Sequence, residues 1–592
     1  MSAMKIIRWL LAAATLTTFT VFAVDDEFHA AIGPLQTRWA KVVTPGNVWS
    51  EYPRPQMVRK SWLNLNGVWE YTIIETKVPA PASYQGRILV PFPVESALSG
   101  VMRRLDEKHH LVYRRSFKIP RNWHGQRVLL HFGAVDWETK VFINSVEVGG
   151  HRGGYDPFTF DITTALKPGG AQEIVVDVFD PTDKGGQPRG KQVLEPKGIV
   201  YTPTSGIWQT VWLEPVPETS LDDLLITPDV DHNTLRLSAQ VRAGSGDEEV
   251  DAVAFENGKE VGRGSGKAGT ELQISLPQPK LWSPEHPFLY DLKIELHRGK
   301  ARLDSVASYF AMRKISLGKD ARGIMRPMLN GRCIFQIGPL DQGFWPDGIY
   351  TAPTDAAMRY DIEMTKKLGF NMTRKHVKVE PDRWYYYCDK LGLLVWQDMP
   401  SANNKTEADK QEFERELRQM IASHRNHPCI VMWVVFNEGW GQFDTERLTD
   451  LVKQIDPSRL VDDATGWTDK GAGDVIDIHK YPGPESPETE ANRAAVLGEF
   501  GGLGFAVDGR TWTKKTWGYK GMASRQALTE NYVNLLNKVF ELKESSGLSA
   551  AVYTQITDVE TECNGLMTYD REIVKPDLEA IAAANRKLQG DN

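Results

Sequence analysis

The stretch Ile430-Val431-Met432-Trp433-Val434-Val435-Phe436-Asn437-Glu438-Gly439-Trp440 decides the fold of this chain. Seven apolar residues follow one another without a polar break and lead into Asn437 and Glu438. Such a run predicts a strand buried on both faces, as in a parallel sheet that helices cover. Barrel enzymes carry their chemistry at the C-terminal ends of such strands. Glu438 could instead cap a helix that begins near Asp444, but a cap favours Asp or Ser and gives Asn437 no role.

A second apolar stretch, Ala494-Ala495-Val496-Leu497-Gly498-Glu499-Phe500-Gly501-Gly502, also delivers a carboxylate at the end of a predicted strand. Glu438 and Glu499 could therefore converge at the mouth of one barrel. Glycoside hydrolysis requires paired carboxylates that flank the scissile bond. The two stretches together predict a glycosidase site.

The composition describes an ordinary globular protein of several domains. A chain of 592 residues is too long for one hydrophobic core. Its 41% hydrophobic and 25% charged residues are typical of folded domains. The net charge of −7 gives no basic surface for nucleic acid. The 18 Trp residues suit sugar stacking and sandwich cores equally.

Residues 1–23 are typical of a secretory signal peptide. Lys5 and Arg8 form a positive start, residues 9–22 are apolar, and Val21-Phe22-Ala23 suits cleavage. No later segment has the roughly 18 consecutive apolar residues of a membrane helix. We therefore expect a periplasmic or secreted protein with no membrane span after signal cleavage, with an uncleaved anchor as the alternative.

The Cys residues predict neither a disulfide framework nor a zinc site, because none of them stands in a C-x-x-C pair. We expect buried free thiols at Cys333, Cys388, Cys429 and Cys563.

The region before the barrel is predicted to be all β. Residues 24–60 form an irregular lead-in segment. Residues 61–215 contain short alternating segments between Gly- and Pro-rich turns, which predicts a jelly-roll sandwich. Residues 216–318 predict an immunoglobulin-like sandwich. The strand segments that support the two sandwiches are 128–132, 140–144, 173–179 and 206–214 in the first, and 234–241, 251–256 and 289–296 in the second, where residues 256–259 form a turn.

Residues 319–592 alternate strands with amphipathic helices, which predicts a (β/α)₈ barrel. The predicted strands are 334–338, 370–376, 393–400, 430–437, 460–465, 475–481, 494–500 and 548–558. The predicted helices are 355–368, 381–391, 408–425, 444–456, 525–545 and 577–588. We therefore expect a multidomain protein of two β-sandwiches and one α/β barrel, in which Glu438 and Glu499 follow strands four and seven.

Four further motifs stand in a recognisable order. They are residues 113–117 and 150–158 in the jelly roll, Leu281-Trp282-Ser283-Pro284 in the second sandwich, and Arg425-Asn426-His427-Pro428 before Asn437-Glu438. With these motifs the sequence resembles glycoside hydrolase family 2, the family of β-galactosidases, β-glucuronidases and β-mannosidases. The resemblance covers nearly the whole mature chain.

The resemblance implies that Glu438 is the general acid/base and Glu499 the nucleophile of a retaining glycosidase. It implies that Tyr481 donates a hydrogen bond to the nucleophile and that Asn437 donates one to the 2-hydroxyl of the sugar. Arg374 would orient the nucleophile through charge-assisted bonds, with a structural salt bridge inside the barrel as the alternative.

The same resemblance implies substrate-binding residues. His376 would face a sugar hydroxyl, although its spacing from Arg374 matches the family's Arg-x-x-His pattern only loosely. Asp398 would bind hydroxyls of the terminal sugar. His479 and Trp467 suit the site and barrel packing about equally.

Departures from the family pattern bear on the substrate. The first barrel strand leads into residues 338–347 rather than into an Arg-His-Glu-type sequence. The Asn-x-Lys pair with which the family's glucuronidases grip a uronate carboxylate is expected before Gly565, but Glu562-Cys563-Asn564 stands there. Asn564 stays a candidate substrate-binding residue, and the missing Lys argues against glucuronides bound in that manner. A basic cluster at one strand end could meet an acidic sugar instead: Arg374, Lys375 and Lys378.

The loop after predicted strand seven, residues 509–520, carries Trp512, Trp517 and Tyr519. These rings are too many for a solvated loop. We expect Trp512 and Trp517 to wall the sugar site, with packing onto a neighbouring domain as the alternative.

The sequence therefore predicts a retaining exo-β-glycosidase that removes terminal β-linked sugars from oligo- or polysaccharides by double displacement. β-Galactosidase is the first choice; β-glucuronidase- or β-mannosidase-type specificity and a non-catalytic carbohydrate-binding protein are the alternatives. We expect a carbohydrate substrate, no nucleic acid, no cofactor and no metal site, and we leave the oligomeric state open. A retaining mechanism predicts roughly 5–5.5 Å between the two carboxyl groups.

Overall fold

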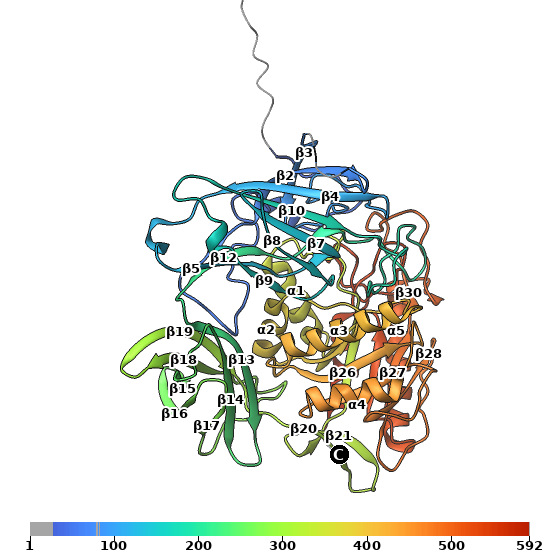
Figure 1. The fold of residues 1–592 in the computed structure, drawn as a ribbon. Helices are drawn as coiled ribbons and strands as arrows, with labels where there is room; N and C mark the ends of the chain where they lie inside the picture. The colour runs from blue at the N-terminus through green and yellow to red at the C-terminus, as the bar shows by residue number, and fades with distance from the viewer. Residues whose placement is uncertain (1–27, 79–80, 82, 591–592) are drawn as a thin grey trace, which may run out of the picture.

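The computed structural model describes residues 28–78, 81 and 83–590 of the chain (Figure 1). The predicted signal peptide, residues 1–23, lies outside this part. The described portion of the lead-in segment packs across domains. Trp49 donates its indole N–H to the carbonyl oxygen of Ala352 in the barrel at 3.0 Å, and Arg59 forms an ion pair of 2.6 Å with Asp304 in the second sandwich.

Antiparallel sheets form the N-terminal sandwich, drawn in blue and teal in Figure 1. The smaller sheet has the order β1 (Leu63–Asn64), β12 (Val211–Val216), β5 (Arg127–Phe132) and β9 (Phe158–Asp161). The larger sheet has the order β3 (Gly86–Val90), β2 (Gly67–Glu75), β4 (His109–Phe117), β10 (Gln172–Phe179), β7 (Glu138–Ile143) and β8 (Val146–Arg152). β6 (Val135–Asp136) pairs with β11 (Gly206–Ile207). Short 3₁₀ turns are η1 (Ala40–Val42), η2 (Arg121–Trp123) and η3 (Thr163–Ala165).

The strands of this sandwich alternate between core and surface. On β10, Ile174, Val176 and Val178 are buried and the residues between them are half-buried. The prediction of one strand at 206–214 is wrong, because residues 208–210 leave the sheet between β11 and β12. There Trp208 donates its indole N–H to Gly154 at 2.8 Å and accepts a hydrogen bond from the Thr351 hydroxyl of the barrel at 2.6 Å.

The second sandwich has two antiparallel sheets, which confirms the immunoglobulin-like prediction. The first sheet has the order β13 (Ser220–Asp229), β14 (Thr234–Arg242) and β17 (Glu271–Ser275). The second sheet has the order β16 (Lys259–Lys267), β15 (Glu249–Glu256), β18 (Tyr290–Arg298) and β19 (Ala301–Phe310). Asn257 and Gly258 form the predicted turn between β15 and β16, with φ of 49° and 78°. Positive φ at both positions is the geometry of a tight hairpin turn, and Asn-Gly is the pair that adopts it most easily.

Eight parallel strands form the barrel in the hydrogen-bonded order 5-4-3-2-1-8-7-6 along the chain. Strands five and six, at the two ends of this order, lie in contact without a ladder between them in the described chain, so the barrel is nearly closed. The strands are β23 (Gln336–Asp341), β24 (Met372–Lys375), β25 (Leu394–Asp398), β26 (Ile430–Asn437), β27 (Leu460–Thr465), β28 (Val475–Lys480), β29 (Ala494–Gly501) and β32 (Ala550–Thr554). All residues of β26 and β29 are buried, which explains their unbroken apolar sequence. The predicted fold class is confirmed.

Helices cover the outside of the barrel (Figure 1). They are α1 (Asp355–Lys367), α2 (Asp382–Leu391), α3 (Glu407–His424), α4 (Thr445–Ile455), α5 (Arg525–Ser545) and α6 (Leu578–Gln589). The connections β27–β28 and β28–β29 contain no helix in the described residues. A small antiparallel sheet of β20 (Ile315–Lys319), β21 (Met325–Leu329) and β22 (Arg332–Cys333) precedes the barrel, and β30 (Leu503–Gly504) pairs with β31 (Lys520–Gly521).

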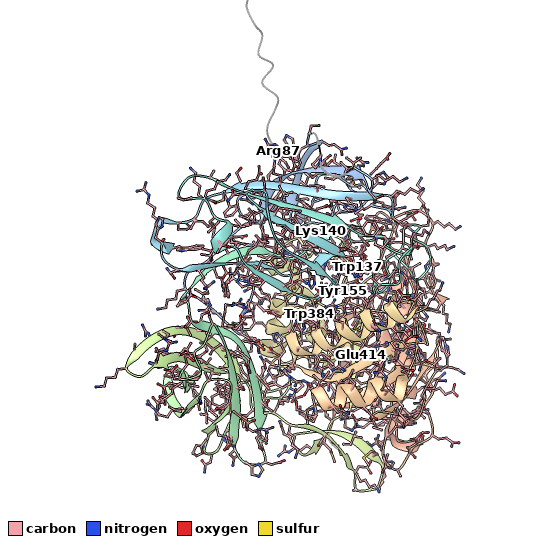
Figure 2. All side chains as sticks on the ribbon, viewed as in Figure 1. Arg87, Trp137, Lys140, Tyr155, Trp384 and Glu414 are labelled. Atoms are coloured by element: carbon pink, nitrogen blue, oxygen red, sulfur yellow. The ribbon has the colours of Figure 1, made fainter. Side chains whose placement is uncertain are left out.

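The N-terminal sandwich sits directly on the barrel helices. Figure 2 labels Trp137 and Tyr155 at this junction. The Trp137 indole N–H donates to Glu416 of α3 at 3.4 Å, and the hydroxyls of Tyr155 and Tyr350 lie 3.4 Å apart. Aromatic side chains therefore fix the sandwich over one side of the barrel.

The motif at residues 425–428 joins the barrel to the second sandwich. Asn426 donates to a carbonyl oxygen of β13 at 2.6 Å. His427 Nδ1 and the Tyr309 hydroxyl both lie 2.7 Å from one oxygen of Asp389, which is fully buried on α2. Burial acts to lower the pKa of His427, but the charge of Asp389 and the hydrogen bonds outweigh it and raise the pKa to about 9.

The described residues also test the predicted burial of the thiols and the predicted absence of a membrane span. Cys388, Cys429 and Cys563 are buried free thiols, as predicted. Cys333 is exposed, so that prediction is wrong for this residue: it lies on the short outer strand β22. Among the described helices, none has the length and apolar character needed to cross a bilayer.

We expect Asp389→Asn to destabilise the protein by about 3–5 kcal/mol, because it breaks a buried ion pair and leaves His427 only the more distant carboxylate of Asp382, 3.7 Å from Nε2, to favour its protonated form. A His whose folded pKa is raised stabilises fully below its unfolded pKa of roughly 6.5. That contribution is lost as the pH rises through about 9. Wild type should therefore lose more stability than the variant between these two pH values. Urea unfolding at each pH measures this, with the exposed Asp291→Asn as the control; equal pH slopes in wild type and Asp389→Asn would contradict it.

Candidate active site

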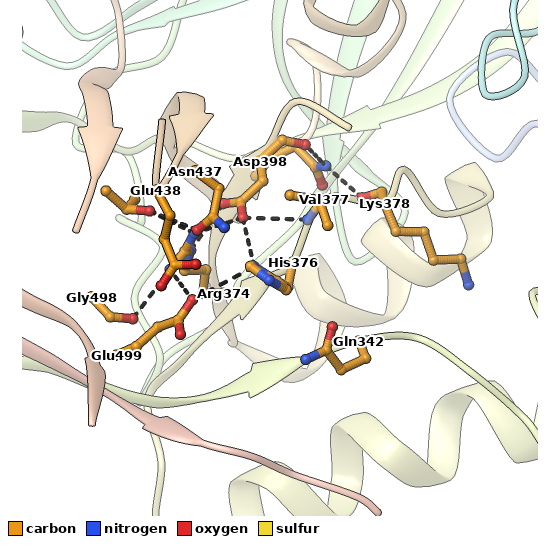
Figure 3. Close-up of polar contacts among 12 residues, drawn as sticks. Gln342, Arg374, His376, Val377, Lys378, Asp398, Asn437, Glu438, Gly498 and Glu499 are labelled. Atoms are coloured by element: carbon orange, nitrogen blue, oxygen red, sulfur yellow. Dashed lines mark hydrogen bonds and ion pairs between the residues drawn. The ribbon is translucent and has the colours of Figure 1, made fainter. Parts of the chain in front are cut away.

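The ends of β26 and β29 place Glu438 and Glu499 face to face at the mouth of the barrel (Figure 3). One carboxylate oxygen of each lies within 4.8 Å of the other. Glu438 follows the last residue of β26 with a left-handed backbone, φ 52°, and its N–H donates to the Thr465 carbonyl oxygen at 3.0 Å. This approach fits the short carboxyl separation of retaining enzymes better than the roughly 6.5–9.5 Å of inverting ones.

Arg374, on β24, is the fully buried centre of the site. It donates to Glu499 Oε1 at 3.1 Å, to both oxygens of Asp398 at 3.1 and 2.9 Å, and to Asn437 Oδ1 at 2.8 Å. Burial acts to lower the pKa of Arg374, but the charges of Asp398 and Glu499 outweigh it and raise the pKa. The orienting contact that we expected between Arg374 and Glu499 is present in the structure.

Asp398 and His376 lie behind the carboxylate pair rather than open to a ligand. Both oxygens of Asp398 accept from Arg374, and Oδ2 also lies 3.1 Å from His376 Nδ1. We expected Asp398 to bind sugar hydroxyls; in the structure it positions Arg374 and His376. Burial lowers the pKa of His376 well below its usual value, and nearby Lys191 and Arg374 act in the same direction. His376 is therefore a neutral ring whose Nδ1–H donates to Asp398, which leaves Nε2 as an acceptor for a substrate hydroxyl.

Glu499 is held as an anion. Its Oε2 accepts from the Tyr481 hydroxyl at 2.5 Å, and Tyr481 also lies 2.6 Å from the Thr554 hydroxyl. Burial acts to raise the pKa of Glu499, but the charges of nearby His479 and Arg374 act against it, and the pKa falls to about 2. Burial and the charge of Glu499 raise the pKa of Tyr481, so that the hydroxyl stays protonated and donates.

His479 lies between the two carboxylates. Its Nδ1 is 2.8 Å from Glu438 Oε1 and 3.6 Å from Glu499 Oε2. Its Nε2 lies 3.5 Å from Nη1 of Arg374, which favours the proton on Nδ1. Burial acts to lower the pKa of His479, but the Glu499 charge and the bond to Glu438 outweigh it and raise the pKa. Of the two uses considered for His479, the structure therefore supports a place in the site.

Asn437 has one polar atom fixed and one left for a ligand. Its Oδ1 accepts from Arg374 at 2.8 Å and from the Thr465 hydroxyl at 2.9 Å. Because the oxygen faces these donors, the amide NH₂ is the group left for a substrate hydroxyl.

The aromatic loop after β29 reaches the site through Tyr519. Its ring stacks on Tyr481, with centroids 3.9 Å apart and planes at 4°. Trp517 packs edge-on against Tyr519 and donates its indole N–H to Gly198 of the N-terminal sandwich at 3.2 Å. Trp512 packs against Tyr569 instead. The wall that we expected from Trp512 and Trp517 is thus made by Tyr519, with Trp517 behind it at a domain contact.

The two remaining candidates differ in exposure. Trp467 is 66% exposed and lies edge-on to His479, with centroids 5.9 Å apart. An exposed ring next to the site suits stacking on a sugar. Asn564 is fully buried and donates to Glu562 Oε1 at 2.9 Å, so it supports Glu562 rather than facing open space.

Two members of the basic cluster have their charges paired inside the protein. Lys375 bonds Asp341 at 2.6 Å and Glu380 at 2.9 Å, and Lys378 bonds Glu380 at 2.8 Å; all four side chains are buried. The idea that Lys375 and Lys378 meet an acidic sugar is therefore wrong.

The sequence reasoning missed the part of the site that the N-terminal sandwich supplies. Residues 180–205, between β10 and β11, contain no strand or helix and extend over the barrel mouth. Tyr201 donates to Glu562 Oε2 at 2.5 Å, and the Thr202 N–H donates to Glu560 at 2.8 Å. Lys191 of the same segment is 6% exposed. The only sequence signal was a long segment without periodicity, and such loops are often functional.

Glu438, His479 and Glu499 also have the spacing of metal ligands, since one donor atom of each lies within 4.8 Å of the others. His479 Nδ1 lies 2.8 Å from Glu438 Oε1, so a hydrogen bond between these two side chains already explains why the three groups lie so close together.

Three family models match the chain in order. They are the sugar binding domain of glycosyl hydrolases family 2 at residues 89–215, the family 2 model at residues 219–313, and the family 2 TIM barrel domain at residues 352–481. The chain belongs to glycoside hydrolase family 2. Glu438 lies inside the matched barrel region, and Glu499 lies beyond it.

Relatives in this family carry more than one name. The chain is 28% identical to a β-galactosidase of Thermoanaerobacter pseudethanolicus over 59% of this chain and 47% of that protein. It is 27% identical to a β-glucuronidase of Bacteroides fragilis over 62% of this chain and 55% of that protein. The chain thus spans about half the length of these two relatives.

Solved structures of similar fold cover nearly the whole chain. A β-glucuronidase of Ruminococcus gnavus has a TM-score of 0.71 at 18% identity, covering 92% of this chain and 100% of that one. A family 2 β-galacturonidase of Eisenbergiella tayi bound to glycerol also has a TM-score of 0.71, at 20% identity, covering 92% and 99%. At these identities the likeness establishes the shared family 2 architecture.

We expect Arg374→Gln to destabilise the protein by about 3–5 kcal/mol at neutral pH, because Asp398 is then buried without its cation. Burial raises the pKa of Asp398, and Arg374 opposes that rise, so its loss should raise the pKa further. A carboxyl with a raised folded pKa costs stability as the pH rises above its unfolded pKa of roughly 3.9. Urea unfolding should show a larger deficit at about pH 7.5 than at about pH 4.5. The exposed Arg302→Gln is the control, and a deficit that does not change with pH would rule out this account of Asp398.

Proposed function

We propose that this chain is a retaining exo-β-glycosidase that acts by double displacement. The carrying observation is the carboxylate pair, with oxygens within 4.8 Å of each other and in different surroundings. Glu499 has two donors, Arg374 and Tyr481, and stays ionised. Glu438 has one oxygen on His479 and the other free to face the substrate. These different surroundings suit Glu499 to the role of nucleophile and Glu438, with one oxygen open to the substrate, to the role of acid.

In the first half-reaction Glu499 attacks the anomeric carbon while Glu438 gives its proton to the departing oxygen. The bond between the sugar and the leaving group breaks, and a glycosyl ester forms on Glu499. His479 keeps the Glu438 carboxyl oriented through Oε1, so that Oε2 carries the transferable proton. The NH₂ of Asn437 is placed to donate to the 2-hydroxyl, a bond that strengthens as positive charge develops on the ring.

In the second half-reaction Glu438 acts as the base. It takes a proton from water, which attacks the anomeric carbon and releases Glu499. Arg374 and Tyr481 then receive Glu499 as the leaving carboxylate, and their donors make it a better leaving group. Two inversions at one carbon give net retention.

Two specificities remain candidates for the terminal sugar. β-Galactoside hydrolysis is the first choice from the sequence, and the Thermoanaerobacter relative supports it. β-Glucuronide hydrolysis has equal support from the Bacteroides relative. A non-catalytic carbohydrate-binding protein would not need both carboxylates together with Tyr481 and Asn437. From the pattern of residues 1–23 we further propose action in the periplasm or outside the cell.

Azide rescue of two variants tests the assignment of roles. Glu438→Ala should still form the glycosyl-enzyme from an activated aryl glycoside, but should release it slowly, since no base activates water. Azide needs no base, so it should restore turnover and give a β-glycosyl azide. Glu499→Ala lacks the nucleophile, so azide should enter from the opposite face and give the α-azide. NMR of the products distinguishes the two.

The opposite pairing of products would mean that the two roles are reversed. Undiminished activity in either variant would place the chemistry elsewhere in the protein. Asp508→Ala, an exposed carboxylate in the barrel domain, serves as the control and should retain wild-type turnover without azide.

A further inference from the structure

Lys191 is a nearly buried residue whose ammonium group forms no direct ion pair with a carboxylate of the described chain. Its residue exposure is 6%, and its Nζ lies 5.7 Å from the Trp440 ring and 6.0 Å from the Tyr201 ring. Within the described part of the chain, Nζ donates no hydrogen bond and has no carboxylate within 4.0 Å. Removing a charge from water without pairing it is costly, so such a group calls for a ligand.

The position of Lys191 is on the sugar side of the site. Trp440 follows Glu438 by two residues, and the Tyr201 hydroxyl bonds Glu562 on the loop after β32. The Lys191 charge acts to lower the pKa of Glu562 on that loop, and also that of Glu499 and of His376 in the site. Lys191 thus lies near the nucleophile without touching it.

The two carboxylates on which the Lys191 charge acts, Glu499 and Glu562, have donors of their own. Glu499 accepts from Arg374 and Tyr481, one on each oxygen. Glu562 accepts from Tyr201 at 2.5 Å and from Asn564 at 2.9 Å, also one on each oxygen. Lys191 Nζ bonds to neither of them, so its N–H groups are available to a substrate.

The segment that carries Lys191 is firmly held. The N–H groups of Arg189 and Gly190 both donate to the Ser401 carbonyl oxygen of the barrel, at 2.9 and 3.0 Å. Tyr201 donates its N–H to the Lys191 carbonyl oxygen at 2.9 Å. Gly190 has φ +59°, and a side chain there would meet the Val377 carbonyl oxygen at 2.3 Å. Lys191 is therefore a preorganised donor rather than a mobile surface lysine.

Three cations that the barrel places near the site are already bound within the protein. Lys375 and Lys378 are paired with Asp341 and Glu380. The guanidinium of Arg374 is surrounded by Asp398, Glu499 and Asn437.

We propose that Lys191 binds the C6 carboxylate of a terminal uronic acid, so that the substrates of this enzyme are β-linked uronides. The N-terminal sandwich, not the barrel, then supplies the cation that selects the sugar. The proposal rests on the proposed function and chooses between its two candidate specificities. It also explains how a uronate is held where Glu562-Cys563-Asn564 offers no Lys.

The test compares Lys191→Met with wild type on matched aryl glycosides. The β-glucuronide is compared with the β-glucoside, and the β-galacturonide with the β-galactoside. The two members of each pair differ only at C6. Wild type should prefer the acid of each pair in kcat/KM. Lys191→Met should lower that acid-to-neutral ratio about 10²–10³-fold, the loss typical of removing one partner of a buried charge pair. Lys197→Met, an exposed lysine on the same segment, should keep the wild-type ratio.

A stability measurement separates a binding role from a structural one. If Lys191 awaits a ligand, Lys191→Met should melt at the same temperature as wild type or higher, because it removes an unpaired buried charge. If Lys191 instead stabilised Glu562 or Glu499, the variant should melt lower and both members of each pair should lose activity together. An unchanged acid-to-neutral ratio, or a wild type that prefers the neutral sugars, overturns the proposal.

Failure of the proposed function would look different. Wild type that cleaves neither member of any pair contradicts the glycosidase itself. In that case calorimetry can still decide the role of Lys191. It measures the binding of D-glucuronate and of D-glucose to wild type and to Lys191→Met. A preference for D-glucuronate that the variant loses supports the carboxylate site, and equal binding of both sugars by wild type overturns it.

Discussion

The buried guanidinium of Arg374 is the constraint on which the site depends. It reaches Asp398 on β25, Asn437 on β26, Thr465 on β27 and Glu499 on β29, with donor–acceptor distances of 2.8–3.1 Å. A charge so completely removed from water is tolerable only where anions and dipoles surround it. Because those partners come from different strands, one side chain sets the relative positions of the nucleophile and of the amide that meets the sugar. The charges and dipoles of the site are therefore in place before any substrate binds. Such preorganisation is the main source of electrostatic stabilisation of transition states in enzymes.

The barrel supplies this chemistry, and the N-terminal sandwich supplies the outer part of the site. Tyr201 donates a hydrogen bond to Glu562, and Thr202 donates one to Glu560, both on the loop after β32. In the other direction, Trp517 of the barrel domain donates one to Gly198 of the sandwich. These contacts involve the loops that follow β29 and β32, the strands on which Glu499 lies and beside which it packs. A mouth covered from one side suits the end of a sugar chain better than its middle. Under the proposed function, recognition of the terminal sugar is a property of the two domains together.

The sequence predicted the elements well where burial leaves a clear pattern. β26 and β27 have the predicted bounds, and so does α5, because continuous apolar runs and helical periodicity are local signals. The prediction of a strand at 206–214 failed because Trp208 leaves the sheet to pack at a domain junction, which no local pattern encodes. The placement of Glu438 and Glu499 was predictable, since strand ends in a barrel converge. The contact of Tyr201 with Glu562 was not, because it joins segments 361 positions apart.

The basic residues also show what the sequence predicts and what only the folded structure shows. In the sequence Lys375, Lys378 and Lys191 are equivalent as charges, and a cluster of cations on one strand end suggests acid binding. In the fold Lys375 and Lys378 are held by Asp341 and Glu380, which neutralise them inside the protein. Lys191 is almost as deeply buried but is flanked by the rings of Tyr201 and Trp440 instead of by a carboxylate. A ring can stabilise a cation only weakly compared with an anion. The partner of a charge, and not its residue type or position in the sequence, therefore decides whether it serves the fold or a ligand.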